Sequence, residues 1–372
     1  MFTKARLKDY NFKLLFNVLL LLGIGSIFVY SADHSYLVRE ITGIILGLIV
    51  MIFLSFVEYD FICKFSRVIY IGTIIVMLSV LVLGQNVNGA TRWISIGGAG
   101  GVQFQPSEFS KIAMILFAAT HLDKHKSRGT INTAPCLTYF IVTVGIYLLT
   151  IFLEPDLSTT VCITLILLTM LYVSGLSYKI IGLTLLIMVP VVGSFLWYIQ
   201  QPFQHLLKEY QVGRILQFIY PEKYAEDFSQ QSNSIMAIGS GQLTGKGLST
   251  STIATVKDAN FISEQQTDFI FSVIGEEVGF IGSVIIIAII LVLVLQCIRI
   301  GRQAKDTKGM LIATGMGCWI GYQSFINIAV ASGIGPNTGM PLPFISYGQS
   351  SLLSLSIGIG ILLNVSIHRT RY

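Results

Sequence analysis

Four carboxylates lie close together, immediately before an uncharged segment. The stretch EQQTDFIFSVIGEE, residues 264–277, contains Glu264, Asp268, Glu276 and Glu277. Residues 278–298 carry no charge, and a run of this length can cross a bilayer core of about 30 Å as a helix. Charges at the entrance of a membrane helix are costly, so Asp268 is a candidate for a functional residue. Thr267 and Asp268 could equally do no more than cap the start of that helix, where acids complement the helix dipole.

Further polar residues lie beside other apolar segments. Arg92 and Trp93 are adjacent, which allows either a cation–aromatic pair or a tryptophan anchor at the membrane interface. Glu108 and Lys111 are spaced i,i+3. We expect them to form an ion pair that faces a wet or protein-lined cavity, because a charged pair facing lipid would be costly. Asp156 stands in EPDLSTT at the start of another apolar segment, and the chemistry of a helix start explains this motif fully.

Two glycine-rich stretches invite a ligand-binding interpretation. AIGSGQLTGKG, residues 237–247, lacks the spacing of a nucleotide phosphate loop, but its backbone N–H groups and Lys246 could bind another phosphate weakly. GMPLPFISYGQSS, residues 339–351, predicts a rigid and potentially re-entrant turn before the last helix, with Ser346 as a candidate cap. No paired-histidine motif is apparent among the five scattered histidines, and the five cysteines lack metal-ligand spacing. We therefore expect the cysteines to be small buried hydrophobic residues.

The elements that must position these residues are membrane helices. Of the 372 residues 53% are hydrophobic and 12% are charged, and the mean hydropathy is +0.74. Soluble domains are about 25% charged, so the composition predicts an all-α, polytopic integral membrane protein, and the net charge of +5 is not a sign of nucleic-acid binding. Ten apolar runs are candidate transmembrane helices, at residues 14–32, 36–57, 67–84, 107–121, 134–153, 157–175, 179–200, 276–298, 309–331 and 346–367.

The placement of Lys and Arg predicts the orientation of these helices. With a cytoplasmic N-terminus, the inner segments hold 16 of the 24 Lys and Arg residues and the outer segments hold 7. We therefore expect both termini in the cytoplasm, a first helix that is retained rather than cleaved as a signal peptide, and a single domain over residues 1–372. Residues 201–267 form a long outer stretch in which apolar and charged residues alternate. This pattern predicts short helices that lie on the membrane surface.

Three classes of function fit a helical bundle with a polar outer pocket. Acidic and basic side chains that converge on the outer face suit an enzyme acting on an anionic, lipid-linked substrate. An acid–base pair within the bundle, Glu108 and Lys111, would also suit a flippase that transports such a substrate. A membrane scaffold for a cell-wall complex is the third possibility, and it predicts that the outer acids are dispensable.

Seven segments in a fixed order resemble one known family. The order is RWISIGG, FQPSEFSK, EPDLSTT, GRILQFIYPE, QQSNSIMAIGSGQLTGKGLS, TDFIFSVIGEEVGFIG and MPLPFISYGQSSLL. Each is weak alone, but together they resemble the shape, elongation, division and sporulation (SEDS) family, which includes RodA, FtsW and SpoVE. The short N-terminus is more RodA-like than FtsW-like. The resemblance implies a peptidoglycan glycosyltransferase that polymerises lipid II on the outer face of the bacterial cytoplasmic membrane. It also implies a class B penicillin-binding protein and other cell-wall machinery as partners.

The resemblance also assigns roles to residues of this chain. Asp268 matches the family's essential aspartate and is the expected general base for the acceptor sugar hydroxyl. The expected substrate-binding residues are Arg92, Trp93, Glu108, Lys111, Asp156, Arg214, Lys246, Thr267 and Ser346. A divalent cation, Mg²⁺ or Mn²⁺, and basic residues would neutralise the pyrophosphate leaving group, and no nucleotide is expected. Gln266 and Gln349 depart from the family's usual His and Gly, and the second departure puts the geometry of the last turn in doubt.

Overall fold

The computed structural model describes most of the chain. It covers residues 10–87, 90–96, 102–201, 203–223, 229–248, 262 and 264–369. The two chain ends, whose cytoplasmic placement is predicted above, lie outside the described residues, as do parts of the long outer stretch at 202, 224–228, 249–261 and 263.

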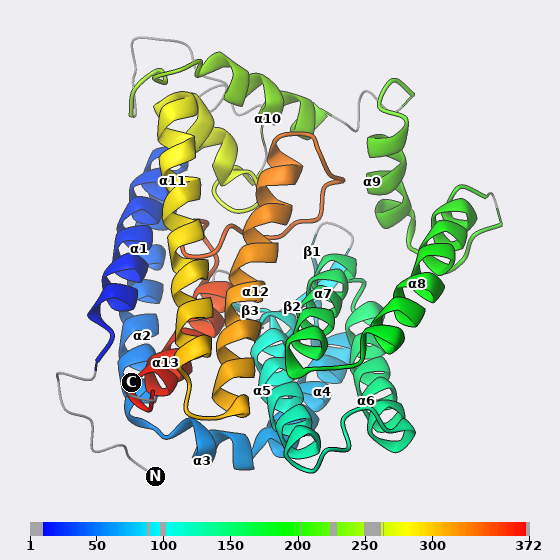
Figure 1. Cartoon of the computed structure of the whole chain (residues 1–372). Coiled ribbons are helices and arrows are strands. Elements are labelled where there is room, and N and C mark those ends of the chain that lie inside the picture. Colours follow the sequence, from blue (N-terminus) through cyan, green and yellow to red (C-terminus); the bar gives the residue numbers. More distant parts are fainter. Residues whose placement is uncertain are drawn as a thin grey trace.

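Ten long helices form the bundle within the described chain, and each predicted span falls on one of them (Figure 1). Eight of the ten are long and apolar enough to cross a membrane, whereas the sequences of α5 and α12 are too polar to meet that criterion. For α5 and α12, membrane crossing stays a prediction. The helices are α1 Phe12–Ala32, α2 Leu37–Phe56, α4 Ser66–Leu83, α5 Pro106–Ser127, α6 Ala134–Leu153, α7 Leu157–Ser174, α8 Tyr178–Ile199, α11 Ile270–Gln303, α12 Thr307–Ala331 and α13 Gln349–Ile367.

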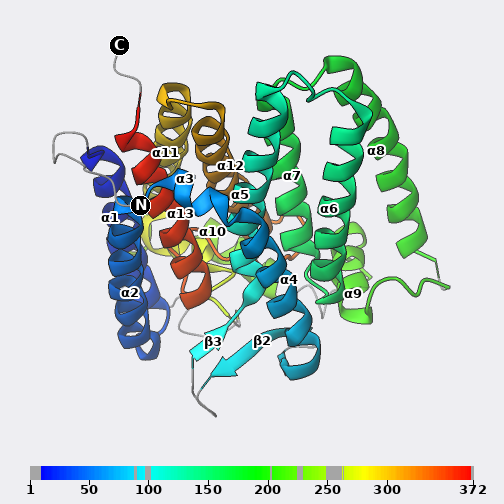
Figure 2. The same ribbon diagram turned by 90° about the horizontal axis from the view of Figure 1, so that it is seen from below.

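The two more polar helices lie inside the bundle. Helix α5 packs against α4, α7, α12 and α13, and α12 also packs against α11. Figure 2 shows α5 between the group of α1, α2 and α11 and the group of α6, α7 and α8. Other helices shield α5 and α12, and they can therefore carry the polar residues of the interior. In contrast, α8 lies at the edge of the bundle, and apart from Ile199 none of its residues is buried.

Several short helices and strands lie at the end of the bundle at which α11 begins. Helices α9 Glu209–Ile219 and α10 Ser229–Ser240 confirm short helices in the long outer stretch, and α10 lies across that end of the bundle (Figure 1). The segment between α4 and α5 forms an antiparallel sheet that the sequence did not predict. The sheet has the order β1 Gln85–Val87, β2 Ala90–Ile96, β3 Val102–Phe104. The remaining short elements are the 3-10 helix His34–Tyr36 and α3 Tyr59–Lys64, which lies at the opposite end.

The glycine-rich stretch 241–247 packs against a break in α11. The backbone of Gly279 has φ +64 and interrupts the helix. A Cβ on Gly279 would lie 2.3 Å from the backbone nitrogen of Gly245, so both positions require glycine. The N–H groups of Lys246 and Gly247 donate to the carbonyls of Glu276 and Glu277 at 2.9 and 3.0 Å. These N–H groups are therefore not available to a phosphate, and the phosphate-loop interpretation of this stretch is wrong.

Candidate active site

Asp268 faces Arg214 across a glycine. Its backbone carbonyl accepts a hydrogen bond from Asn327 Nδ2 at 2.8 Å, and the same nitrogen lies 2.7 Å from the carbonyl of Met340. Asn327 thereby ties the Asp268 segment to the turn that contains Gly339. A Cβ at Gly339 would lie 3.3 Å from Asp268 Oδ2 and 3.5 Å from Arg214 Nη1. The absence of a side chain at Gly339 therefore leaves room between the Asp268 carboxylate and the Arg214 guanidinium.

Asp268 does not cap the helix that follows it. Helix α11 begins at Ile270, with Phe269 in the capping position and no side-chain cap. The Thr267 hydroxyl instead donates to the carbonyl of Glu264 at 3.1 Å. The Asp268 carboxylate accepts no hydrogen bond from any residue that the structure describes, so its oxygens are free for a ligand. The alternative interpretation of Thr267 and Asp268 as a helix cap is therefore wrong.

The surroundings of Asp268 tune its proton affinity. Burial raises the pKa of the Asp268 carboxyl to about 6; Arg214 lowers it and the nearby Glu264 raises it. Burial also lowers the pKa of Arg214, but guanidinium groups remain charged in proteins. A carboxylate whose pKa lies just below neutral is ionised at pH 7 and still has appreciable affinity for a proton. This is the property that a general base requires.

Arg92 joins strand β2 to helix α9 and to the start of α7. Its guanidinium donates to Tyr210 Oη at 2.9 Å and to the carbonyl of Pro155, and its Nη1 lies 3.9 Å from Asp156 Oδ1. Although burial lowers the pKa of Arg92, the Asp156 carboxylate raises it above its ordinary value. Because successive side chains of a strand point to opposite faces, Trp93 points away from this group. The expected cation–aromatic partner of Arg92 is not Trp93, and the aromatic residue at the site is Tyr210, whose ring lies 5.7 Å from Arg214 Cζ.

Asp156 is a fully engaged structural acid. It caps α7 by accepting from the Thr159 N–H at 3.1 Å, and its other oxygen accepts from the hydroxyls of Ser107 at 2.8 Å and Thr159 at 2.9 Å. Burial raises the pKa of Asp156, but Arg92 and these hydrogen bonds together hold it below its ordinary value. The predicted helix-start role of Asp156 is confirmed. Its contact with a substrate stays a prediction, because its oxygens already have partners.

Glu154 lies two residues before Asp156, but its carboxyl group is not engaged in the same way. Neither of its carboxyl oxygens has a hydrogen-bond partner among the described residues. Burial, and then the charge of Asp156, raises its pKa to about 8. The pKa values of these two neighbouring acids are therefore shifted in opposite directions, which the sequence alone did not reveal.

Glu108 and Lys111 form a second cluster, deep between α5 and α12. Lys111 Nζ lies 2.7 Å from Glu108 Oε1 and 2.8 Å from Gln323 Oε1. Trp319 Nε1 donates to the same Gln323 oxygen at 2.7 Å, and Gln323 Nε2 donates to the carbonyl of Pro341 at 2.9 Å. The predicted ion pair is confirmed, and it is enclosed by protein. Because Pro341 and Gly339 belong to the same turn, this cluster supports the segment that borders Asp268.

Two further predicted site residues have partners elsewhere. Lys246 pairs with Glu276 at 2.7 Å, and no contact within the described ranges joins it to Asp268. Ser346 does not cap α13, which begins at Gln349 without a side-chain cap. Its hydroxyl donates to the carbonyl of Thr267 at 2.6 Å and accepts from the Leu342 N–H at 2.7 Å. Ser346 thus fastens the last turn to the Asp268 segment.

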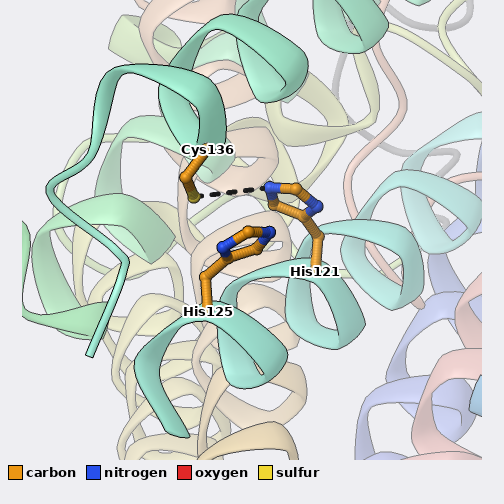
Figure 3. Close-up of side chains that lie close together, drawn as sticks. All are labelled: His121, His125 and Cys136. Carbon is orange, nitrogen blue, oxygen red and sulfur yellow. Dashed lines mark hydrogen bonds between the residues drawn. The ribbon is translucent and has the colours of Figure 1, made fainter. Parts of the chain in front are cut away.

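The sequence-based analysis missed several residues that the fold brings together. Tyr210, Asn327 and Gly339 surround Asp268 and Arg214, and no local pattern marks them. His121 and His125 lie one turn apart on α5 and meet Cys136 of α6 (Figure 3). The i,i+4 spacing of the two histidines was visible in the sequence, so the expectation of no paired histidines is wrong.

Comparisons with known proteins agree with this architecture. A family model described as "Cell cycle protein", which covers FtsW, RodA and SpoVE, matches residues 12–371. A probable peptidoglycan glycosyltransferase FtsW from Haemophilus influenzae is 33% identical over 96% of this chain and 89% of its own length. The peptidoglycan glycosyltransferase MrdB of Escherichia coli is 32% identical over 95% of this chain and 92% of its own length. Relatives with both names match almost equally, so the comparisons do not favour one branch of the family.

Solved structures share the fold. RodA from Thermus thermophilus superposes with a TM-score of 0.69 at 24% identity, over 98% of both chains. A chain in the structure described as "Structural coordination of polymerization and crosslinking by a peptidoglycan synthase complex" has a TM-score of 0.79 at 24% identity, over 96% of this chain and 97% of that one.

Proposed function

This chain belongs to the FtsW, RodA and SpoVE family and is a multi-pass membrane peptidoglycan glycosyltransferase, and we propose that Asp268 is its general base. The proposed substrate is lipid II, a disaccharide–peptide linked to a polyprenyl diphosphate. The observation that carries the proposal is the carboxylate of Asp268. It has no hydrogen-bond partner in the described part of the chain, its pKa is raised to about 6, and it faces Arg214 across Gly339.

Asp268 would take the proton of the acceptor hydroxyl. As the acceptor sugar oxygen bonds to the anomeric carbon of the donor, the bond from that carbon to the lipid diphosphate breaks, and the proton passes to a carboxylate oxygen of Asp268. Such a base contributes about 10²–10⁴ in rate. The diphosphate leaves as an anion, so no second carboxylic acid is required. This distinguishes the reaction from hydrolysis by two carboxylates.

Positive charge for the leaving group is close to Asp268. Arg214 makes no hydrogen bond or ion pair with any described residue, and Arg92 is held in place by Asp156 and Tyr210. A guanidinium fork matches the oxygens of a phosphate. We propose that Arg214 contacts the diphosphate and that Arg92 acts from further away. Charges fixed in advance in this way stabilise the anion as it forms.

A divalent cation also fits this site. Mg²⁺ prefers carboxylate and phosphate oxygens, and the carboxylate of Asp156 is already fully engaged in hydrogen bonds. Glu264, whose charge acts on the pKa of Asp268, is the acid that would hold the ion with the substrate, so that Asp268 stays free to accept the proton. When bound, the ion would add positive charge beside the diphosphate.

The location and partners of the enzyme follow from the same proposal. We infer that the chain resides in the bacterial cytoplasmic membrane with Asp268 on the extracytoplasmic side, where the sugars of lipid II stand in water while its tail stays in the bilayer. Lys and Arg gather on the side opposite Asp268, which supports this orientation. A chain with this fold occurs in a peptidoglycan synthase complex. We propose a class B penicillin-binding protein, which crosslinks the strands, as the partner of this chain.

The test compares Asp268→Asn with a matched acid elsewhere. The full chain, purified with its class B partner, is given lipid II, and glycan strands are separated by size. Asp60→Asn is the control, because Asp60 lies in a half-exposed ion pair with Lys305 and Lys308. We expect polymer from wild type and Asp60→Asn, and at least about 100-fold less from Asp268→Asn. Near-normal polymerisation by Asp268→Asn, with an unchanged gel-filtration profile, would refute the proposed base.

The buried pair of Glu108 and Lys111 is the observation that would suit a flippase. In that case a lipid-linked substrate would cross vesicle membranes at the same rate in wild type and in Asp268→Asn, without polymer from either. Polymerisation by the wild-type protein would exclude lipid transport as its main activity.

A further inference from the structure

We propose that His121, His125 and Cys136 form a binding site for a zinc-class transition-metal ion. The site lies at the end of α5 opposite the candidate active site. The histidines are one turn apart on α5, and Cys136 projects toward them from the first turn of α6 (Figure 3). One ligand atom from each residue can be chosen so that all three lie within 4.8 Å of one another. Two nitrogens and one sulfur make up a ligand set that Zn²⁺ prefers.

His121 and Cys136 already have the spacing of two ligands in a tetrahedral site. His121 Nε2 lies 3.6 Å from Cys136 Sγ. Zinc bonds of about 2.3 Å to sulfur and about 2.0 Å to nitrogen, at a tetrahedral angle, place the two ligand atoms about 3.6 Å apart. The same distance suits a thiol–imidazole hydrogen bond. The experiment below therefore needs a signal that only a metal–thiolate bond produces.

His125 is oriented in the way that metal ligands usually are. Its Nδ1 lies 2.9 Å from the hydroxyl of Thr130. A ligating histidine generally uses one ring nitrogen for the metal and the other for a neighbouring polar group, which fixes the ring. Thr130 can play that part here and leaves Nε2 of His125 for the ion. The rings of His121 and His125 lie 4.6 Å apart between centroids, so His125 can offer a nitrogen to the same ion as His121 and Cys136.

A cavity next to the histidines offers a fourth position. It encloses about 210 Å³ and is lined by His121, His125, Arg67, Lys124, Thr120 and Tyr139, among others. Arg67 and Lys124 are exposed. Their charge opposes a bare cation, and the negative charge of the Cys136 thiolate offsets part of this. We expect the fourth ligand to be water or an anion, since an anion would be stabilised by the same two side chains.

The site would act on the same helices as the candidate active site, but from the other end. From Glu108 to His121 the helix rises about 20 Å, so this site does not share atoms with the site around Asp268. Ser107, in the first turn of α5, binds Asp156, and α6 ends at Leu153, next to Glu154. A bound metal would link the far ends of these two helices. Its main effect would be to stabilise the pair, because a ligand that binds only the folded state raises its stability.

Cobalt substitution gives the decisive signal. The full chain in detergent, under reducing conditions, is titrated with Co²⁺ and with Zn²⁺. We expect one equivalent of Co²⁺ to produce a thiolate-to-metal charge-transfer absorption, Zn²⁺ to displace it, and Zn²⁺ to raise the melting temperature by a few degrees. Cys136→Ser and His121→Ala should lose the absorption and the shift. The matched controls Cys318→Ser and His34→Ala, whose residues lie outside the cluster, should keep both.

Two results would overturn the proposal. One is the absence of any charge-transfer absorption in a wild-type protein that gel filtration shows to be folded. The other is a melting temperature that rises with inorganic phosphate rather than with Zn²⁺ and loses this response in Arg67→Gln and Lys124→Gln, but not in Cys136→Ser. That outcome would identify the cavity as an anion site instead.

Discussion

At the scale of single residues, the raised pKa of Asp268 predicts how activity depends on pH. A base must be deprotonated, so polymerisation should fall with an acid limb near pH 6. The same shift has the opposite sign for stability. Because folding raises the pKa of this acid, its contribution to stability is present below its unfolded pKa of about 4 and is lost as the pH rises through about 6. Initial rates of glycan synthesis between pH 5 and 8 measure the activity limb.

Arg214 should set the position of that limb. Its positive charge lowers the pKa of Asp268, so Arg214→Gln should move the acid limb to higher pH, in addition to weakening the reaction. Lys208→Gln is a suitable control, since Lys208 is an exposed cation at the start of the same helix. An acid limb that stays near pH 6 in Arg214→Gln would show that Arg214 does not influence the ionisation of Asp268.

Gly339 tests whether the space between Asp268 and Arg214 is used. In Gly339→Ala the new methyl group would lie 3.3 Å from Asp268 Oδ2 and 3.5 Å from Arg214 Nη1, on a backbone with φ +68. Gly129→Ala imposes a similar backbone strain at φ +66 with nothing within 4 Å. We expect both variants to lose similar stability, of about 1 kcal/mol. Only Gly339→Ala should lose most of its polymerising activity, and equal rates in the two variants would contradict a substrate in this space.

At the scale of elements, the core helices α5 and α12 depend on a buried ion pair. Lys111→Met would leave the Glu108 carboxylate buried without its cation, which costs about 3–5 kcal/mol. Adding Glu108→Gln should recover a large part of that loss, because the pair is then replaced by neutral groups. Lys305→Met removes a half-exposed ion pair and should cost at most about 1 kcal/mol. Thermal unfolding in detergent measures all three variants, and equal losses for Lys111→Met and Lys305→Met would contradict this account.

The sequence predicted the long elements far better than it predicted the contacts between them. Ten apolar runs corresponded to ten helices because the length of an apolar run is a local property of the sequence, although α5 and α12 are too polar to meet the criterion for a membrane span. The sheet between α4 and α5 was missed, since its strands are short and its partners are set by the fold. The position of Asp156 at a helix start was predicted, because the chemistry of a helix start is decided within a few residues, but its exact role as the cap of α7 came from the structure. Tyr210 and Gly339 were missed, because their proximity to Asp268 is created by residues far apart in the chain.

The family motifs select candidate residues for the site, whereas their contacts in the structure show which of them are available for chemistry. The motif order selected Asp268, Arg92 and Arg214, and the structure places them near one another. The same motifs also contain Lys246 and Ser346, whose contacts are with Glu276 and with the backbone of Thr267. A motif can mark a residue for packing as readily as for chemistry. The coordinates separate the two cases by showing which side chains still lack partners among the described residues.

At the scale of the whole molecule, the bundle consists of a polar interior inside an apolar coat. Large hydrophobic side chains are exposed along α2, α4, α6, α8 and α11, which suits contact with lipid. Helices α5 and α12 can carry Glu108, Lys111 and Gln323 because other helices cover them. The hydropathy of a single segment therefore misjudges the central helices of a bundle, and these are the helices that bring polar groups to the site.

The orientation of this bundle can be tested with two cysteine substitutions. Glu209→Cys lies at the start of α9, the helix that carries Arg214, and Ser127→Cys lies at the opposite end of the bundle, at the end of α5. Both positions are exposed. Four of the five native cysteines are buried and Cys318 is only half-buried, so Cys318→Ser gives a background with little labelling of its own. If the site is extracytoplasmic, a thiol reagent that cannot cross membranes should label Glu209→Cys in intact cells, and Ser127→Cys only after lysis. The reverse pattern would place Asp268 in the cytoplasm, where the sugars of an exported lipid-linked substrate could not reach it.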